Sequence, residues 1–195
     1  MRLREGNKEK DIMDAAIKIF ADKGFFKSKI HAIAESAGIA TGSVYLYYKN
    51  KEHILEKIFE MVWKDLFTEV SSLHQREDID PLVKLEMLFD RYFSIFIKNT
   101  NLAKVFVQEI EHRFKKGSET YLFYELFFET AEKIVRQGMD LGLVNKDIDP
   151  KVLRYFILGG VRSLLAQWAV NHKQMKLETV KQNLILIVLN GIRTR

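Results

Sequence analysis

Apolar residues recur every three or four positions along almost the whole chain, which is the spacing of helices with one buried face. In the first such stretch, Ile12, Ala16, Ile19 and Phe20 fall on one side of a helix that ends at Gly24. No segment alternates apolar and polar residues as a half-buried strand would. The pattern therefore predicts an all-α protein of about nine helices, over residues 8–23, 29–36, 41–47, 51–73, 81–98, 101–113, 118–141, 150–171 and 178–192.

Several of these helices begin at residues that cap a free backbone N–H. Asp80 and Asp149 each precede a proline, and an aspartate cap followed by proline is a helix-start signal. Ser28 and Asn50 are the expected caps of helices 29–36 and 51–73. No long flexible linker interrupts the pattern, so we expect the two ends of the chain to pack together and to share helix 51–73.

Composition removes several classes of function. The chain has no Cys, and its five His are scattered, so we expect no structural metal site and no thiol chemistry. Neither a signal peptide nor an apolar run long enough to span a bilayer is evident, which predicts a cytoplasmic protein with no membrane partner. The net charge of +5 fits an anionic partner, and residues 1–53 hold ten Lys/Arg against seven Asp/Glu.

Two short predicted helices are joined by Gly38-Ile39-Ala40, the arrangement of a helix-turn-helix. The second helix of such a unit enters the DNA major groove, where hydroxyls and lysines bind phosphate. The stretch TGSVYLYYKNK supplies both, and we expect Val44 and Tyr48 to share a small core with Ile33 and Ile54. From residue types alone, ordinary helix packing explains these tyrosines equally well.

Residues 10–56 resemble the N-terminal domain of the TetR family of bacterial repressors. The resemblance is carried by Gly24-Phe25, Ile33-Ala34, Gly38-Ile39 and the segment from Tyr45 to Glu52. It implies a DNA-binding domain over residues 1–50 and an effector-binding and dimerisation domain over residues 51–195. The DNA contacts that it implies are Ser28, His31, Thr41, Gly42, Ser43, Tyr45, Tyr47 and Lys51. Lys29 departs from the threonine that is usual at its position.

Residues 89–128 hold eleven of the 23 aromatic residues of the chain. Each ring taken singly is best explained as core, but together they suit an apolar cavity between helices. TetR-like proteins bind small effectors in such a place. Basic residues at 113–116 either complement a helix dipole or clamp an anion beside the cavity. The expected ligand-binding residues are Phe89, Phe93, Phe96, Phe106, Ile110, Arg113, Lys116, Phe123 and Phe127.

The last two predicted helices are apolar on too many sides for one subunit to cover. With the family resemblance, this predicts a homodimer formed by helices Val152–Trp168 and Val180–Ile192, which would bind a palindromic double-stranded DNA operator.

These features predict a ligand-responsive repressor rather than an enzyme, with no catalytic residues and no cofactor. The weaker likeness of its C-terminal segments to acyl-CoA-responsive TetR-type repressors makes the expected effector a long-chain acyl-CoA that controls fatty-acid metabolism genes. Two alternatives remain at this point. One is a TetR-type repressor of an efflux or detoxification gene that responds to drug-like compounds. The other is an acyl-CoA or lipid carrier.

Overall fold

The computed structural model describes residues 8–109, 116–170 and 175–194. Within these residues the chain forms helices and no strand, which confirms the predicted all-α class. The helices are α1 (Lys8–Lys23), α2 (Ile30–Ser36), α3 (Thr41–Val44), α4 (Lys51–Gln75), α5 (Pro81–Lys98), α6 (Thr100–Glu109), α7 (Glu119–Asp140), α8 (Pro150–Val170) and α9 (Leu177–Ile192).

Most of the predicted helix starts are confirmed. The Asp80 carboxylate accepts a hydrogen bond from the backbone N–H of Leu82 at 2.7 Å, and the Asn50 side chain accepts one from His53 at 2.8 Å. The predicted Ser28 cap is wrong. Helix α2 begins one residue later, after an extended Lys29 that makes no side-chain cap. Since Lys has no acceptor atom, it cannot take the place of a Ser or Asp at this position.

Helix α3 is shorter than predicted because its last residues continue as tight turns. The N–H of Leu46 bonds back to the carbonyl of Ser43, and that of Tyr47 bonds to Val44. The chain nevertheless keeps a helical rotation as far as Tyr48, whose N–H reaches the Val44 carbonyl at 2.9 Å. The end of predicted helix 101–113 lies outside the described residues beyond Glu109.

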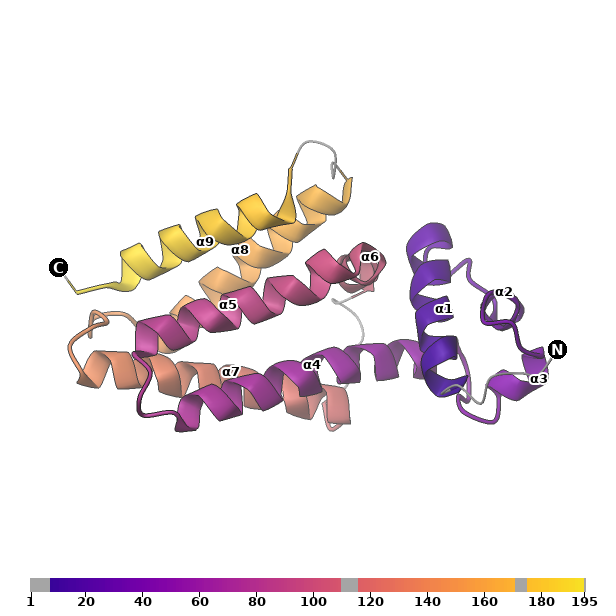
Figure 1. Cartoon of the computed structure of the whole chain (residues 1–195), viewed down its shortest axis with the longest axis horizontal. Helices are drawn as coiled ribbons and strands as arrows, with labels where there is room; N and C mark the ends of the chain where they lie inside the picture. The colour runs from indigo at the N-terminus through magenta and orange to yellow at the C-terminus, as the bar shows by residue number, and fades with distance from the viewer. Residues whose placement is uncertain (1–7, 110–115, 171–174, 195) are drawn as a thin grey trace.

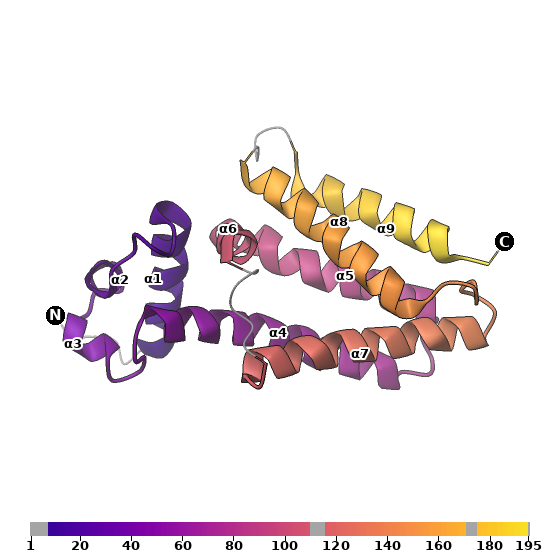
Figure 2. The same cartoon turned by 180° about the vertical axis from the view of Figure 1, so that it is seen from behind.

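Helices α1–α3 form a small head at one end of the molecule, and α4–α9 form an elongated body (Figure 1). In the body α4 lies beside α7, and α5 lies between this pair and the layer of α8 and α9 (Figures 1 and 2). Helix α1 of the head also packs against α6. Only α4 belongs to both parts, since it begins beneath the head and runs along the body (Figure 2).

A cluster of aromatic rings holds α4 in the body. The indole of Trp63, which is 1% exposed, lies 4.9 Å from the ring of Tyr124 and 5.7 Å from those of Phe127 and Phe128 on α7. On its other side it lies 5.8 Å from the ring of Phe106 on α6. Because close-packed interiors resist local deformation, a displacement of α7 is expected to be felt by α4.

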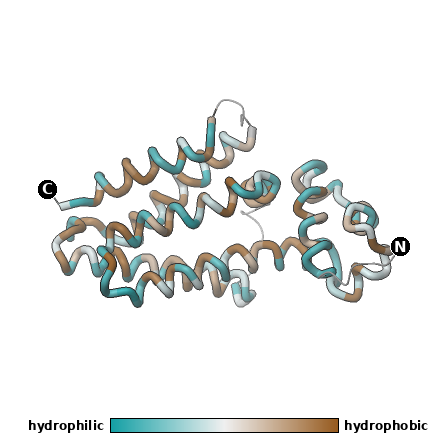
Figure 3. The backbone as a smooth tube through the Cα atoms, in the orientation of Figure 1, coloured by the Kyte–Doolittle hydropathy of each residue, from teal (hydrophilic) through white to brown (hydrophobic). Residues whose placement is uncertain are grey.

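Hydrophobic and hydrophilic stretches alternate along the helices, as expected for amphipathic elements around one core (Figure 3). Among the described residues, none of the helices combines the length and the hydropathy that a membrane span requires.

Candidate DNA-reading head and effector cavity

The segment from Thr41 to Tyr48 is anchored by two side chains on one face. Val44 and Tyr48 are 0% and 1% exposed and join Ile33 and Ile54 in the core, which confirms the predicted small core. The Tyr48 hydroxyl donates to the backbone carbonyl of Glu9 at 3.3 Å, and burial raises the pKa of this phenol. Tyr48 is therefore a structural residue that fastens the reading segment to α1.

The opposite face of this segment is open. Tyr45 and Tyr47 are 56% and 39% exposed, and Gly42 is exposed between half-buried Thr41 and Ser43. Lys27, Lys29, His31 and Lys49 of the same part of the chain are also exposed. Hydroxyls and basic side chains are the groups with which proteins bind DNA phosphates. The DNA contacts assigned to His31, Thr41, Gly42, Ser43, Tyr45 and Tyr47 stay predictions.

Ser28 does not belong to this open surface. Its side chain is buried, and its hydroxyl donates to the carbonyl of Gly24 at 2.7 Å, with Ile19 as a further acceptor at 3.3 Å. The hydroxyl therefore satisfies the end of α1, and no surface is left for a phosphate. The predicted role of Ser28 in DNA binding finds no support in this geometry.

The side chain of Lys51 bonds to the backbone of the head, and its predicted DNA contact stays a prediction. Its Nζ donates to the backbone carbonyls of Phe25, Phe26 and Ser28 at 2.9, 3.0 and 3.2 Å. The same ammonium lies 4.6 Å from the centroid of the Phe25 ring. A cation at the first residue of a helix opposes the helix dipole, so its presence there calls for such compensation. The half-buried Lys51 therefore ties α4 to the turn between α1 and α2.

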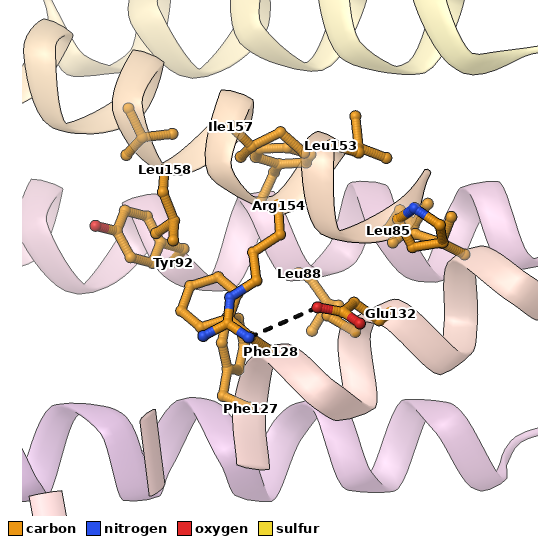
Figure 4. A pocket seen from close by; sticks show the side chains of 15 residues that line it. Leu85, Leu88, Tyr92, Phe127, Phe128, Glu132, Leu153, Arg154, Ile157 and Leu158 are labelled. Atoms are coloured by element: carbon orange, nitrogen blue, oxygen red, sulfur yellow. Dashed lines mark ion pairs between the residues drawn. The ribbon is translucent and has the colours of Figure 1, made fainter. Parts of the chain in front are cut away.

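An apolar cavity of about 110 Å³ lies in the body between α5, α7 and α8 (Figure 4). Its wall is made of leucine, isoleucine, valine and aromatic side chains, and its only ionisable carboxylate and guanidinium are those of Glu132 and Arg154. The residues that line it are Leu85, Leu88, Phe89, Tyr92, Phe127, Phe128, Ala131, Glu132, Val135, Pro150, Leu153, Arg154, Ile157, Leu158 and Val161. Burial raises the pKa of the Tyr92 phenol at this wall, so the hydroxyl is neutral at pH 7.

Arg154 is a buried cation that the sequence analysis missed. Its side chain is only 10% exposed and forms ion pairs with Glu125 at 3.1 Å and Glu132 at 3.6 Å, the second of which is drawn in Figure 4. Its guanidinium carbon also lies 4.5 Å from the centroid of the Phe128 ring. The available signal was a single arginine within the apolar stretch VLRYFIL of α8, where a cation needs a partner.

The predicted ligand-binding residues are only partly brought together by the fold. Phe89 and Phe127 line the cavity. Phe93, Phe96 and Phe106 do not, because they are at most 1% exposed and pack inside the core. Phe123 is also absent from the lining, and its ring lies 6.0 Å from that of Phe67 on α4. Lys116 is exposed and lies outside the cavity lining, and Ile110 and Arg113 lie outside the described residues.

Within the described residues no cluster of three or more His, Asp or Glu side chains is placed to hold a metal ion. The described residues offer two candidate sites, the open surface on the head and the apolar cavity in the body.

Comparison with known families assigns both parts of the molecule. The family model for bacterial regulatory proteins of the tetR family matches residues 12–58, and the model for the C-terminal region of YsiA-like proteins matches residues 60–191. The chain belongs to the TetR family. It is thus a DNA-binding repressor of the TetR type and not an enzyme.

Individual relatives of this TetR-family chain cover nearly its whole length. The fatty acid metabolism regulator protein of Bacillus subtilis is 25% identical over 185 residues, which are 94% of this chain and 95% of that protein. The crystal structure of FadR from Bacillus subtilis in complex with stearoyl-CoA has the same fold, with a TM-score of 0.80, 24% identity, and coverage of 94% and 99%. SmeT, the repressor of a multidrug efflux pump of Stenotrophomonas maltophilia, has a TM-score of 0.77 at 22% identity and coverage of 97% and 92%.

Replacing Lys51 in this TetR-family head should loosen the turn that it holds. We expect Lys51→Met to lose about 1–2 kcal/mol of unfolding free energy, since it removes charge-assisted hydrogen bonds to carbonyls from a half-buried site. The measurements are urea unfolding and amide hydrogen exchange of residues 25–29. Lys49→Met is the matched control, because Lys49 is exposed. Equal stability and equal exchange in the two variants would contradict the assigned role of Lys51.

Removing Arg154 alone should destabilise the body more than removing the ion pair as a whole. Arg154→Leu leaves the carboxylate of Glu132, which is 13% exposed, without its cation, and we expect a loss of about 3 kcal/mol. Adding Glu132→Leu should recover most of that loss, because a buried pair is replaced by apolar side chains. Urea midpoints compare the single and double variants. A double variant less stable than the single one would show that the charges do not act as a pair.

Proposed function

We propose that this chain is a dimeric repressor of fatty-acid metabolism genes, released from its operator by a long-chain acyl-CoA. The observation that carries the proposal is the apolar cavity between α5, α7 and α8, whose lining shares Phe127 and Phe128 with the aromatic cluster around Trp63 on α4. A ligand in the cavity would therefore contact Phe127 and Phe128, which pack against Trp63 of α4, the helix that begins beneath the head.

The reading head is proposed to enter the major groove with the open face of the segment from Thr41 to Tyr47. The hydroxyls of Thr41, Ser43, Tyr45 and Tyr47 are the proposed donors to phosphates and base edges, and bare Gly42 allows the backbone to come close. A side chain at Gly42 would meet no protein atom within 4 Å, so the fold does not require glycine there. Exposed Lys27, Lys29 and His31 are the proposed partners of the phosphate backbone.

The chemistry of the cavity favours an apolar chain as the effector. The protein is similar to a regulator whose crystal structure contains stearoyl-CoA, and this similarity supports an acyl-CoA as the effector here as well. A cavity of about 110 Å³ is too small for a long chain, since about 150 Å³ holds a single benzene ring. Binding would therefore favour a form in which α8 has moved away from α5 and α7, and this unequal affinity is what shifts the population.

The proposed dimer uses apolar side chains that one subunit leaves exposed on α8 and α9. Val152, Tyr155 and Phe156 on α8 are 66%, 67% and 67% exposed, and Leu186 and Ile187 on α9 are 59% and 63% exposed. Two adjacent helices that both expose large apolar side chains are typical of an interaction surface. A second copy placed by a twofold axis would cover them and would hold the two heads at a fixed spacing.

The proposal predicts that long-chain acyl-CoA dissociates the protein from DNA. Fluorescence anisotropy of a labelled duplex from the DNA flanking its own gene should show tight binding that weakens steeply with salt, because phosphate contacts release counterions. Stearoyl-CoA should release the duplex, and coenzyme A without an acyl chain should not. Ala131→Leu, which fills part of the cavity, should keep operator binding and lose the release.

The other outcomes of this titration identify the alternatives. If the DNA complex persists in acyl-CoA but is dissociated by drug-like aromatic compounds, the effector is a drug-like compound, as for an efflux-type repressor, and not an acyl-CoA. Acyl-CoA binding without any salt-dependent DNA affinity would indicate a lipid carrier and would overturn the proposal.

The proposed interface predicts that one charge on each helix dissociates the dimer. Phe156→Asp combined with Ile187→Asp should give a folded monomer, because burying the carboxylates would cost about 3 kcal/mol or more. Sedimentation velocity measures the oligomeric state, and far-UV circular dichroism checks the fold. Leu141→Asp, at a site that is 67% exposed at the end of α7, is the control and should leave the dimer intact. A double variant that remains dimeric would place the interface elsewhere.

A further inference from the structure

The reading segment from Thr41 to Tyr48 has an unusual composition for a surface that recognises bases. It contains no Arg, Lys, Asn, Gln, Asp or Glu. These are the side chains that make bidentate or charge-assisted hydrogen bonds to guanine, adenine and cytosine in the major groove. With Val44 and Tyr48 buried, the exposed groups that remain are hydroxyls, which bind several kinds of partner, the rings of Tyr45 and Tyr47, and the aliphatic side chain of Leu46.

Leu46 lies at the apex of the open face. It is two residues from buried Val44 and two from buried Tyr48. At a helical rotation of about 100° per residue, Leu46 therefore points away from the side on which both of these residues are buried. Its side chain is 81% exposed, more than Tyr45 at 56% or Tyr47 at 39% on its two flanks. Gly42, one turn earlier on the same face, adds no side chain beside it, so Leu46 is the most exposed side chain on this face of the segment.

The chemistry of Leu46 selects its partner within the groove. A leucine cannot hydrogen-bond to a base edge, and phosphates offer it no apolar surface. The only apolar group that base pairs present in the major groove is the C5-methyl group of thymine. When that methyl group packs against Leu46, apolar surface of both groups is removed from water, which is energetically favourable. The other bases lack the methyl group and do not provide this gain.

We infer that Leu46 is a specificity-determining residue that recognises thymine methyl groups at the centre of each operator half-site. The inference rests on the proposed function, because it requires α3 to lie in the major groove. The hydroxyls of the segment then fix its position, and Leu46 distinguishes A·T pairs from G·C pairs at the base pairs that it covers.

Replacing thymine by uracil tests this inference, since the change removes only the methyl group and leaves the base pair intact. A duplex that the protein selects from a random pool would be remade with deoxyuridine at one thymine of a half-site at a time. We expect one or two central positions at which affinity falls about four-fold, the effect of one buried methyl group. Leu46→Ala should bind the thymine and uracil duplexes equally, and Leu46→Met should keep the difference.

Leu141→Ala is the matched control, because it removes another exposed leucine, at the end of α7, and should keep the full thymine preference. A preference that persists unchanged in Leu46→Ala would overturn the inference, as would a selected duplex insensitive to uracil at every position. Both results would leave the repressor proposal standing. Failure to select any duplex above non-specific binding would instead overturn the repressor proposal together with this inference.

Discussion

The packing of Trp63 against rings of α6 and α7 is the contact on which the relation between the two parts depends. It locks the middle of α4 into the body, while the first turns of the same helix lie beneath the reading head. Helix α4 is 25 residues long and has buried residues from Ile54 to Leu73, so it cannot slide without repacking the core at both of its ends. Packed interfaces of this kind have discrete arrangements and do not deform continuously. In the proposed mechanism, a change in the cavity wall at Phe127 and Phe128 would reach the head through these ring contacts with α4.

Two cations stabilise the ends of this route in similar ways. Lys51 joins the start of α4 to three carbonyls of the turn after α1, and Arg154 joins α8 to two glutamates of α7. Each also lies against an aromatic ring, Phe25 in one case and Phe128 in the other. Both cations are partly or largely buried, and a buried cation must be paired. Their common role is to fix one helix against its neighbour, and Arg154 does so at the edge of the proposed effector site.

In the proposed repressor, the head would separate positioning from recognition. The segment from Thr41 to Tyr48 has no charged side chain, and the exposed lysines of the head lie outside it. Contacts to phosphates supply affinity without sequence information, whereas base edges supply specificity. A protein arranged in this way would bind DNA through salt-sensitive contacts and would select its operator through weaker apolar and hydroxyl contacts. Any tilt of α3 would then disturb recognition first, because these contacts depend on short distances.

The sequence by itself determined the helices, most of their caps and the small core of the head. These features depend on residues within a few turns of each other, as with Asp80 and Leu82 or Val44 and Tyr48, so periodicity and side-chain type suffice. Only the tertiary structure decided that Ser28 and Lys51 donate to backbone carbonyls, and that Phe93, Phe96 and Phe106 fill the core while Phe89 and Phe127 line the cavity. The reason is that a helical stripe specifies a buried face but not what covers it. Whether a ring meets another ring, an empty space or Arg154 depends on where α8 packs, and α8 lies far away in the chain.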